Sequence, residues 1–208
     1  MSFVLPKLYP LTDVGLTGLT HAEQVRRLAS GGASLIQLRE KTRGAREFHA
    51  SAKAALMVAK ESGIKLIIND RVDIAAALGA DGVHLGQDDL PVSAARELLG
   101  PQAIIGLSTH NMRQAQAALN LSIDYLALGP IFSTSTKDDT APELGVEGLR
   151  EVRHALGEFP LVAIGGITAD RALDVIRAGA NSVAVISAVL NNPEEIVDKT
   201  SHLVQLLR

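Results

Sequence analysis

The chain repeats one arrangement, in which a segment with helical periodicity ends near a glycine and a short apolar strand follows. SGGASLIQL, LGADGVHL and AGANSVAV show it most closely, and ESGIKLII, LLGPQAIIGL, NLSIDYLAL and ALGEFPLVAI show variants of it. Glycine suits these positions because it readily adopts the left-handed backbone conformation that often ends a helix. Apolar strands that alternate with helices are typical of a parallel sheet covered by helices.

Eight strand–helix units predict a (β/α)8 TIM barrel, an α/β fold in which residues 1–208 form a single domain. The predicted strands are 7–13, 34–40, 65–69, 81–86, 103–107, 124–129, 160–165 and 182–187. The predicted helices are 21–31, 45–62, 71–79, 91–99, 111–120, 146–156, 169–178 and 193–207. The alternative is an open doubly wound sheet, but LTDVGLTGLT lacks the glycine-rich nucleotide turn that usually follows its first strand.

Composition narrows the classes of function. With 208 residues, 47% of them hydrophobic, the chain can bury the core of one domain. It has no apolar run of membrane-spanning length and no signal-peptide pattern at its N-terminus, so we expect a cytoplasmic protein without a membrane partner. The absence of cysteine excludes disulfides and thiolate metal sites, and a net charge of −3 with 3% aromatic residues disfavours nucleic acid. The sequence is compatible with a homo-oligomer.

Polar residues gather after the predicted strands, where barrels of this kind place their active sites. They include Gln37, Arg39, Glu40 and Lys41, Asn69 and Asp70, Asp88 and Asp89, Ser108 and His110, the run GPIFSTSTKDD at 129–139, Gly165 and Gly166, and Ile186 and Ser187. The turns that enter the strands carry mostly glycine, alanine and small polar residues. The pattern therefore predicts one functional mouth.

Alternation in LIQLREK, residues 35–41, sets Ile36, Leu38 and Glu40 on one face of a strand. Leu35, Gln37, Arg39 and Lys41 lie on the other face. The cationic end is either a solvated strand end or part of a site. Asp70 and Asp89 are likewise either helix caps or ligands of a hard cation such as Mg²⁺.

Taken together, these residues favour a site for two anions. Arg39, Lys41 and Lys137 bring three positive charges that suit a diphosphate. Gly165, Gly166, Ile186 and Ser187 follow the last two strands, the usual phosphate position in such barrels. His84 is expected to be a packed, hydrogen-bonded interior residue. His21, His49, His154 and His202 are expected on helix surfaces, and residues 133–143 are expected to form a loop that becomes ordered with substrate.

Seven motifs in order give the chain a family resemblance: QLREK at 37–41, NDR at 69–71, GVHLGQDD at 82–89, GLSTH at 106–110, GPIFSTSTK at 129–137, AIGGI at 163–167 and AVISA at 184–188. Over almost its whole length the chain resembles the thiamine-phosphate synthase (thiamine-phosphate pyrophosphorylase) family. The resemblance implies a transferase of thiamine biosynthesis. Such an enzyme couples 4-amino-2-methyl-5-(diphosphooxymethyl)pyrimidine with a thiazole phosphate to give thiamine phosphate and pyrophosphate, by a dissociative substitution through a pyrimidine carbocation.

The resemblance also implies roles for individual residues. The pyrimidine diphosphate would be bound by Gln37, Leu38, Arg39, Glu40, Lys41, Asn69, Ser108 and Lys137. The thiazole phosphate would be bound by Thr134, Ser135, Thr136, Gly166, Ile186 and Ser187. Asp70 and Asp89 would hold one Mg²⁺ per active site, and Arg39, Lys41 and Lys137 would act in catalysis. The alternatives are a thiazole tautomerase-like isomerase of the same fold, a sugar-phosphate epimerase and a non-catalytic sensor.

Overall fold

The computed structural model describes residues 3–134 and 142–208, and its strands form one parallel eight-stranded sheet in the order β1-β8-β7-β6-β5-β4-β3-β2. The strands are β1 (Leu8–Pro10), β2 (Leu35–Leu38), β3 (Lys65–Asn69), β4 (Gly82–Leu85), β5 (Ile104–Thr109), β6 (Tyr125–Leu128), β7 (Leu161–Ile164) and β8 (Ser182–Val185). A bridge between Leu11 and Gln37 joins the two ends of this order, so the sheet closes. The predicted (β/α)8 barrel is confirmed, and the open sheet is excluded.

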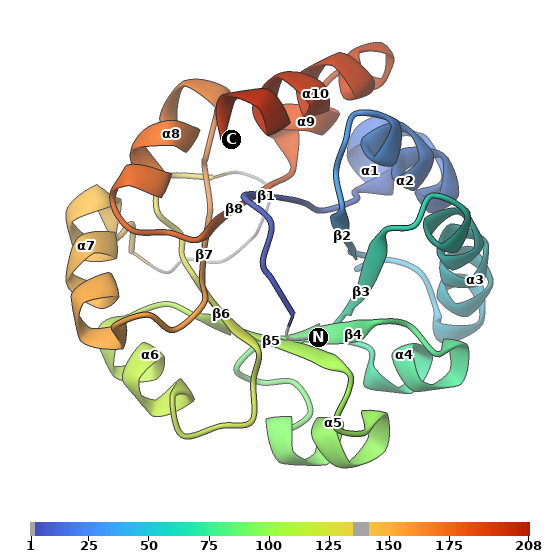
Figure 1. Ribbon diagram of the computed structural model, residues 1–208. Coiled ribbons are helices and arrows are strands. Elements are labelled where there is room, and N and C mark those ends of the chain that lie inside the picture. Colours follow the sequence, from blue (N-terminus) through green and yellow to red (C-terminus); the bar gives the residue numbers. More distant parts are fainter. Residues whose placement is uncertain (1–2, 135–141) are drawn as a thin grey trace.

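Helices surround the closed sheet (Figure 1). They are α1 (Val14–Thr17), α2 (His21–Ser30), α3 (Ala45–Glu61), α4 (Val72–Leu78), α5 (Val92–Leu99), α6 (Met112–Ala118), α7 (Gly145–Leu156), α8 (Ala169–Arg177), α9 (Ser187–Leu190), the 3₁₀ helix η1 (Pro193–Glu195) and α10 (Ile196–Leu206). The predicted helices lie within a few residues of these bounds. The sequence did not predict α1 and α9, because four residues are too few to show a helical period.

Two buried layers make up the core. Inside the barrel, Tyr9, Leu35, Ile67 and Tyr125 pack together, and residues of the N-terminal segment pack against them. Figure 1 shows this segment crossing the open end of the barrel before β1. The second layer lies between strands and helices and contains Ile36 among other residues. Strand alternation therefore sends the Ile36 face of β2 toward the helices and the Gln37 face toward the interior.

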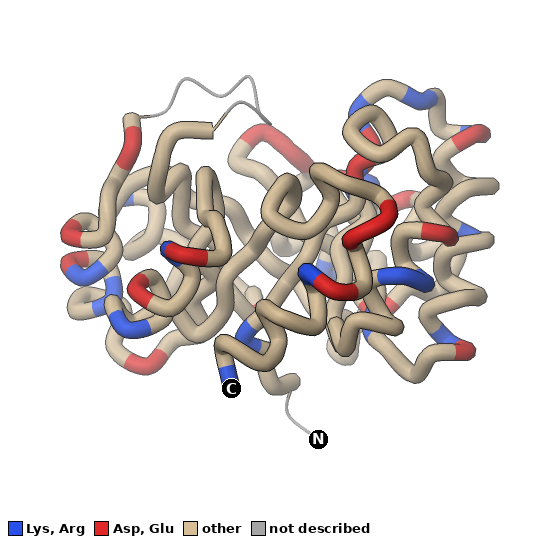
Figure 2. Tube along the Cα trace, turned by 90° about the horizontal axis from the view of Figure 1, so that it is seen from above, with Lys and Arg blue, Asp and Glu red and all other residues tan. Residues whose placement is uncertain are grey.

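The outside of the barrel carries both signs of charge. Figure 2 shows Lys and Arg interspersed with Asp and Glu around the helices. No helix in the described part of the chain is long and apolar enough to cross a membrane.

Candidate active site

A cavity of about 560 Å³ lies at the C-terminal ends of the barrel strands. Its lining includes eleven of the residues predicted to bind substrate or metal: Gln37, Arg39, Lys41, Asn69, Asp70, Asp89, Ser108, Thr134, Gly166, Ile186 and Ser187. Residues from β2, β3, β4, β5, β7 and β8 thus meet at one mouth, as the strand-end rule predicts.

Some predicted site residues lie elsewhere. Leu38 is fully buried in the layer between strands and helices, and Glu40 lies on the same face of the strand as Leu38. Neither belongs to the cavity lining. Ser135, Thr136 and Lys137 lie outside the described residues, as does most of the loop predicted at 133–143.

Two carboxylates and one ammonium group meet at the mouth. The Lys41 Nζ atom lies 2.5 Å from the Asp70 Oδ2 atom. Asp89 accepts a hydrogen bond of 2.6 Å from the Gly86 N–H. Burial raises the pKa of Asp89, and the nearby Asp70 carboxylate raises it further, while the Gly86 N–H and the Lys41 charge oppose this. Repulsion between carboxylates is therefore built into this corner of the cavity.

Asp70 does not serve as a helix cap. The N-cap of α4 is Arg71, and no side chain makes a capping hydrogen bond there. Asp70 instead has a φ of 60°, in the left-handed region that non-glycine residues seldom adopt, and its N–H donates to the His84 carbonyl oxygen at 2.8 Å. Such strained conformations cluster at functional sites. Asp89 is not a cap either, because α5 has Pro91 at its N-cap.

The donor set at this corner fits Mg²⁺. The described residues contain no group of three or more acidic or histidine side chains that could hold a metal on their own. Magnesium is usually bound by one or two carboxylates together with substrate phosphates and water. Burial and the neighbouring Asp70 carboxylate both raise the pKa of Asp89, and a divalent cation bound by the two side chains would favour their charged forms.

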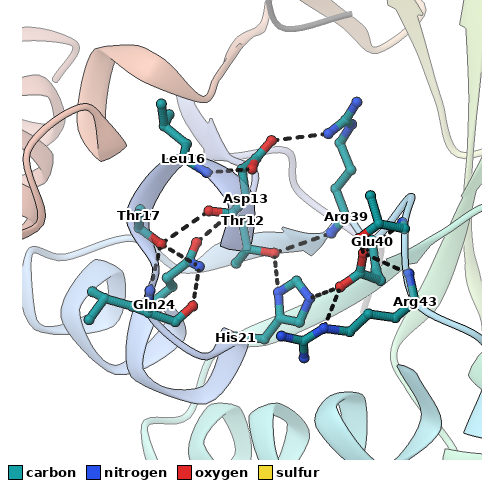
Figure 3. Close-up of polar contacts among 11 residues, drawn as sticks. Thr12, Asp13, Leu16, Thr17, His21, Gln24, Arg39, Glu40 and Arg43 are labelled. Atoms are coloured by element: carbon teal, nitrogen blue, oxygen red, sulfur yellow. Dashed lines mark hydrogen bonds and ion pairs between the residues drawn. The ribbon is translucent and has the colours of Figure 1, made fainter. Parts of the chain in front are cut away.

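Arg39 is held by a carboxylate that sequence reasoning did not select. Its Nη1 atom lies 3.1 Å from the Asp13 Oδ2 atom, and Asp13 also caps α1 through a bond from the Leu16 N–H (Figure 3). The two residues are 26 positions apart and follow the neighbouring strands β1 and β2. No local pattern links them, because only closure of the barrel brings these strand ends together.

A buried chain of hydrogen bonds crosses the barrel interior below the cavity. Gln37 Nε2 donates to the Tyr9 hydroxyl at 3.1 Å, and the Tyr9 and Tyr125 hydroxyls lie 2.8 Å apart. Tyr125 bonds His84 Nδ1 at 3.0 Å, and His84 Nε2 bonds the Ser108 hydroxyl at 2.8 Å. Burial raises the pKa of both tyrosines, so they are neutral phenols. The prediction that His84 is a hydrogen-bonded interior residue is confirmed.

The opposite side of the cavity is shaped by glycine. Gly165 and Gly166 have φ values of 101° and 60°. A Cβ atom on Gly166 would lie 2.3 Å from the Ser133 carbonyl oxygen. The turn after β7 therefore requires glycine both for its positive φ angles and for lack of space. After β8, Ile186 is the N-cap of α9 and Ser187 is its first residue. These two connections border the cavity together.

His21 departs from its prediction. It was expected on a helix surface, but it is 1% exposed. Its ring lies between Thr12 and Glu40 (Figure 3). Helical periodicity at the start of α2 could not reveal this, because Glu40 and Thr12 belong to segments that reach the helix only in the folded barrel.

Known proteins of one family resemble this chain over most of its length. A family model described as thiamine monophosphate synthase matches residues 8–189. A thiamine-phosphate synthase of Chloroflexus aurantiacus is 45% identical over 185 residues, covering 88% of this chain and 85% of the relative. One of Methanoregula boonei is 46% identical over 188 residues, covering 90% and 87%.

A solved structure described as thiamine phosphate pyrophosphorylase from Pyrococcus furiosus superposes with a TM-score of 0.87. It shares 37% identity, and the match covers 97% of this chain and 95% of that one. The chain therefore belongs to the thiamine monophosphate synthase family, whose members are transferases of thiamine biosynthesis.

Proposed function

We propose that this protein is a Mg²⁺-dependent thiamine-phosphate synthase. It joins 4-amino-2-methyl-5-(diphosphooxymethyl)pyrimidine to a thiazole phosphate and releases pyrophosphate. The observation that carries the proposal is the meeting of Lys41, Asp70 and Asp89 at one corner of the cavity, with Lys41 Nζ 2.5 Å from Asp70 Oδ2. A family member that only bound or isomerised the thiazole phosphate would have no use for this diphosphate corner.

The diphosphate is assigned to the side of the cavity that Arg39, Lys41, Asn69 and Ser108 line. Two cationic side chains and two neutral donors suit an anion with several oxygens. Arg39 has a defined orientation before substrate arrives, because Asp13 binds its guanidinium group. The thiazole phosphate is assigned to the Gly166, Ile186 and Ser187 side, with Thr134 beside it. Ser135, Thr136 and Lys137 keep the roles that the resemblance implies for them, outside the described residues.

Asp70 and Asp89 would hold the Mg²⁺ ion. When bound, the ion would neutralise charge on the diphosphate and make pyrophosphate a better leaving group. The Gly86 N–H bond fixes the Asp89 carboxylate, and the Lys41 ammonium group stands beside Asp70. Both residues are therefore placed before a metal binds.

The chemical step is a dissociative substitution. The bond between the pyrimidine methylene carbon and the diphosphate oxygen breaks, and pyrophosphate leaves with both electrons. The resulting carbocation is captured by the lone pair of the thiazole nitrogen. Arg39 and Lys41 stabilise the negative charge that develops on the leaving group, which is where preorganised electrostatics lower a barrier most. Apolar residues of the cavity lining, among them Leu11, Ile164 and Ala184, limit the access of water to the cation.

The direct test mixes the purified protein with Mg²⁺, the pyrimidine diphosphate and the thiazole phosphate, and measures thiamine phosphate and pyrophosphate. We expect both products in equal amounts, and neither when any one component is omitted. Thiamine phosphate formed at an unchanged rate in excess chelator would reject the metal requirement. Isomerisation of the thiazole phosphate with no coupling would replace the synthase by the tautomerase, and binding of both substrates without turnover would indicate a sensor.

A further inference from the structure

The residues proposed to bind the diphosphate lie just past the end of the sheet. The pairing of β2 with β3 ends at Leu38 and Ile68. On the other side of β2, the Leu11–Gln37 bridge and a 2.9 Å bond from the Thr12 N–H to the Gln37 carbonyl oxygen connect it to β1. Arg39, Glu40 and Lys41 therefore extend beyond the last paired residues, and side chains must fix their position.

A second buried chain of contacts does this from outside the cavity (Figure 3). The Arg39 N–H donates to the Thr12 hydroxyl oxygen at 3.2 Å, and that oxygen lies 2.8 Å from His21 Nδ1. His21 Nε2 lies 3.5 Å from Glu40 Oε2. The side chain of His21 is fully buried and that of Glu40 is 5% exposed. The chain of contacts thus begins and ends on two consecutive residues of the segment 39–41.

The direction of these contacts is fixed by chemistry. The ionised Glu40 carboxylate can only accept, so the neutral His21 ring presents its proton on Nε2 and leaves Nδ1 as an acceptor. The Thr12 hydroxyl then donates to His21 Nδ1 and accepts from the Arg39 N–H. His21 Nε2 and Glu40 Oε2 are buried and make no hydrogen bond within normal limits in the described structure. They face each other at 3.5 Å, and Arg43 Nε lies 3.4 Å from the same Glu40 oxygen. Burial lowers the pKa of His21, in keeping with this neutral form.

Glu40 is also bound from its own loop. Its Oε1 atom accepts from the Thr42 N–H and hydroxyl, both at 2.9 Å, and from the Arg43 N–H at 3.3 Å. Burial acts to raise the pKa of Glu40, but these hydrogen bonds outweigh it and the pKa is lowered, so Glu40 is ionised. Because Glu40 is held on the outer face, strand alternation turns its neighbours Arg39 and Lys41 toward the cavity.

We propose that Thr12 and His21 are positioning residues for the diphosphate site: they hold the backbone of Arg39 and the side chain of Glu40, and so aim Arg39 and Lys41 at the diphosphate. This inference rests on the proposed function for the identity of the anion. Neither Thr12 nor His21 lines the cavity, so their effect on substrate passes through Arg39, Glu40 and Lys41. Precise placement of charged donors is what makes such a site effective.

The test compares buried threonines at two places. Thr12→Val removes the hydroxyl that joins the Arg39 N–H to His21, and Thr12→Ser retains it. Thr200→Val is the matched control, because Thr200 is also fully buried and its hydroxyl bonds the Ile196 carbonyl oxygen within α10, away from the cavity. Affinity for pyrophosphate in the presence of Mg²⁺ is measured by calorimetry, together with the Michaelis constants for both substrates and the thermal midpoint.

We expect Thr12→Val to weaken pyrophosphate binding about tenfold and to raise the Michaelis constant for the diphosphate substrate similarly. The constant for the thiazole phosphate stays within about twofold, Thr12→Ser restores binding, and Thr200→Val lowers only the thermal midpoint. His21→Phe, whose ring fits beside Phe48, where the present ring centroids are 6.0 Å apart, should reproduce the Thr12→Val pattern.

Two results would overturn the inference. One is that Thr12→Val and His21→Phe lose stability but bind pyrophosphate as the wild type does. The other is that both substrates are affected equally. Failure of the synthase activity is distinguishable from either result. If the wild type binds pyrophosphate without coupling the substrates, the difference in pyrophosphate affinity between the wild type and the variants still tests the role of Thr12 and His21.

Discussion

Lys41 and Asp70 form an ion pair across the ends of two neighbouring strands, with Nζ and Oδ2 2.5 Å apart. The pair joins the end of β2 to the end of β3, and Asp89 from the end of β4 lies close enough to Asp70 to have its pKa raised by it. In the proposed reaction, both members change partner when substrate binds. Lys41 would then bind the diphosphate, and Asp70 would hold the metal.

Loss of either carboxylate should remove most of the activity. We expect Asp70→Asn and Asp89→Asn to lower turnover by a factor on the order of 10² to 10³, because neither amide supplies the negative charge that would hold the proposed Mg²⁺ ion. Excess Mg²⁺ should restore only part of it. The measurement is the rate of thiamine phosphate formation against Mg²⁺ concentration. Asp73→Asn, on the exposed surface of α4, is the control, and variants that match its rate at every concentration would refute the metal assignment.

Lys41→Met should act mainly on diphosphate binding. The loss of one charged hydrogen bond corresponds to about 1.5–3 kcal/mol, so the Michaelis constant for the pyrimidine diphosphate should rise by about one to two orders of magnitude. The constant for the thiazole phosphate should barely change, because we assign that phosphate to the other side of the cavity, lined by Gly166 and Ser187. Lys60→Met, an exposed change on α3, controls for the loss of charge. Equal effects on both substrates would argue against separate anion sites.

Gly106→Ala should destabilise the barrel interior. A Cβ atom at this position would lie 2.1 Å from Cζ of Tyr125, so the phenol that links Tyr9 to His84 must move. Overpacking and a broken buried hydrogen-bond chain together predict a loss of about 2–4 kcal/mol.

Urea unfolding gives the measurement for this glycine. Gly44→Ala serves as the control, since a Cβ atom there meets nothing within 4 Å. Gly44 is the N-cap of α3, where alanine is less favourable than glycine, so we expect a loss of no more than about 1 kcal/mol. Similar midpoints for the two variants would show that the Tyr125 ring has room that the structure does not provide.

His21 should make stability depend on pH in the mildly acidic range. Its pKa in the folded protein is lowered from 6.5, first by burial, while Glu40 and Asp13 oppose this and Arg43 adds to it. The unfolded chain therefore takes up a proton at a higher pH than the folded one. The free energy of unfolding should fall as pH decreases below about 6.5, and this contribution is absent above it.

His21→Phe removes the titrating group, so its stability should fall less than that of the wild type between about pH 7 and pH 5. Urea unfolding at several pH values for both proteins gives the difference directly, and the other histidines cancel in it. Parallel pH profiles would show that His21 titrates alike in the folded and unfolded chains.

The sequence by itself determined the barrel and most of the cavity lining. Residues such as Lys41, Asp70 and Ser187 could be selected because side-chain alternation along a strand and position after a strand are local properties of the sequence. A parallel barrel then brings all the C-terminal strand ends to one mouth. The family resemblance added a hypothesis for the identity of the two anions. It did not separate residues that face the cavity from their neighbours, so Leu38 and Glu40 were grouped with Arg39.

Only the tertiary structure decided which side chains meet across the closed sheet. Tyr9 of β1 and Tyr125 of β6 are 116 positions apart, and their hydroxyls bond inside the barrel. Asp13 contacts Arg39 where β1 closes on β2. His21 looked like a surface residue because periodicity identifies the face of a helix but not what covers it. Register and closure depend on the packing of all the strands at once, and for that reason no local stretch of sequence contains them.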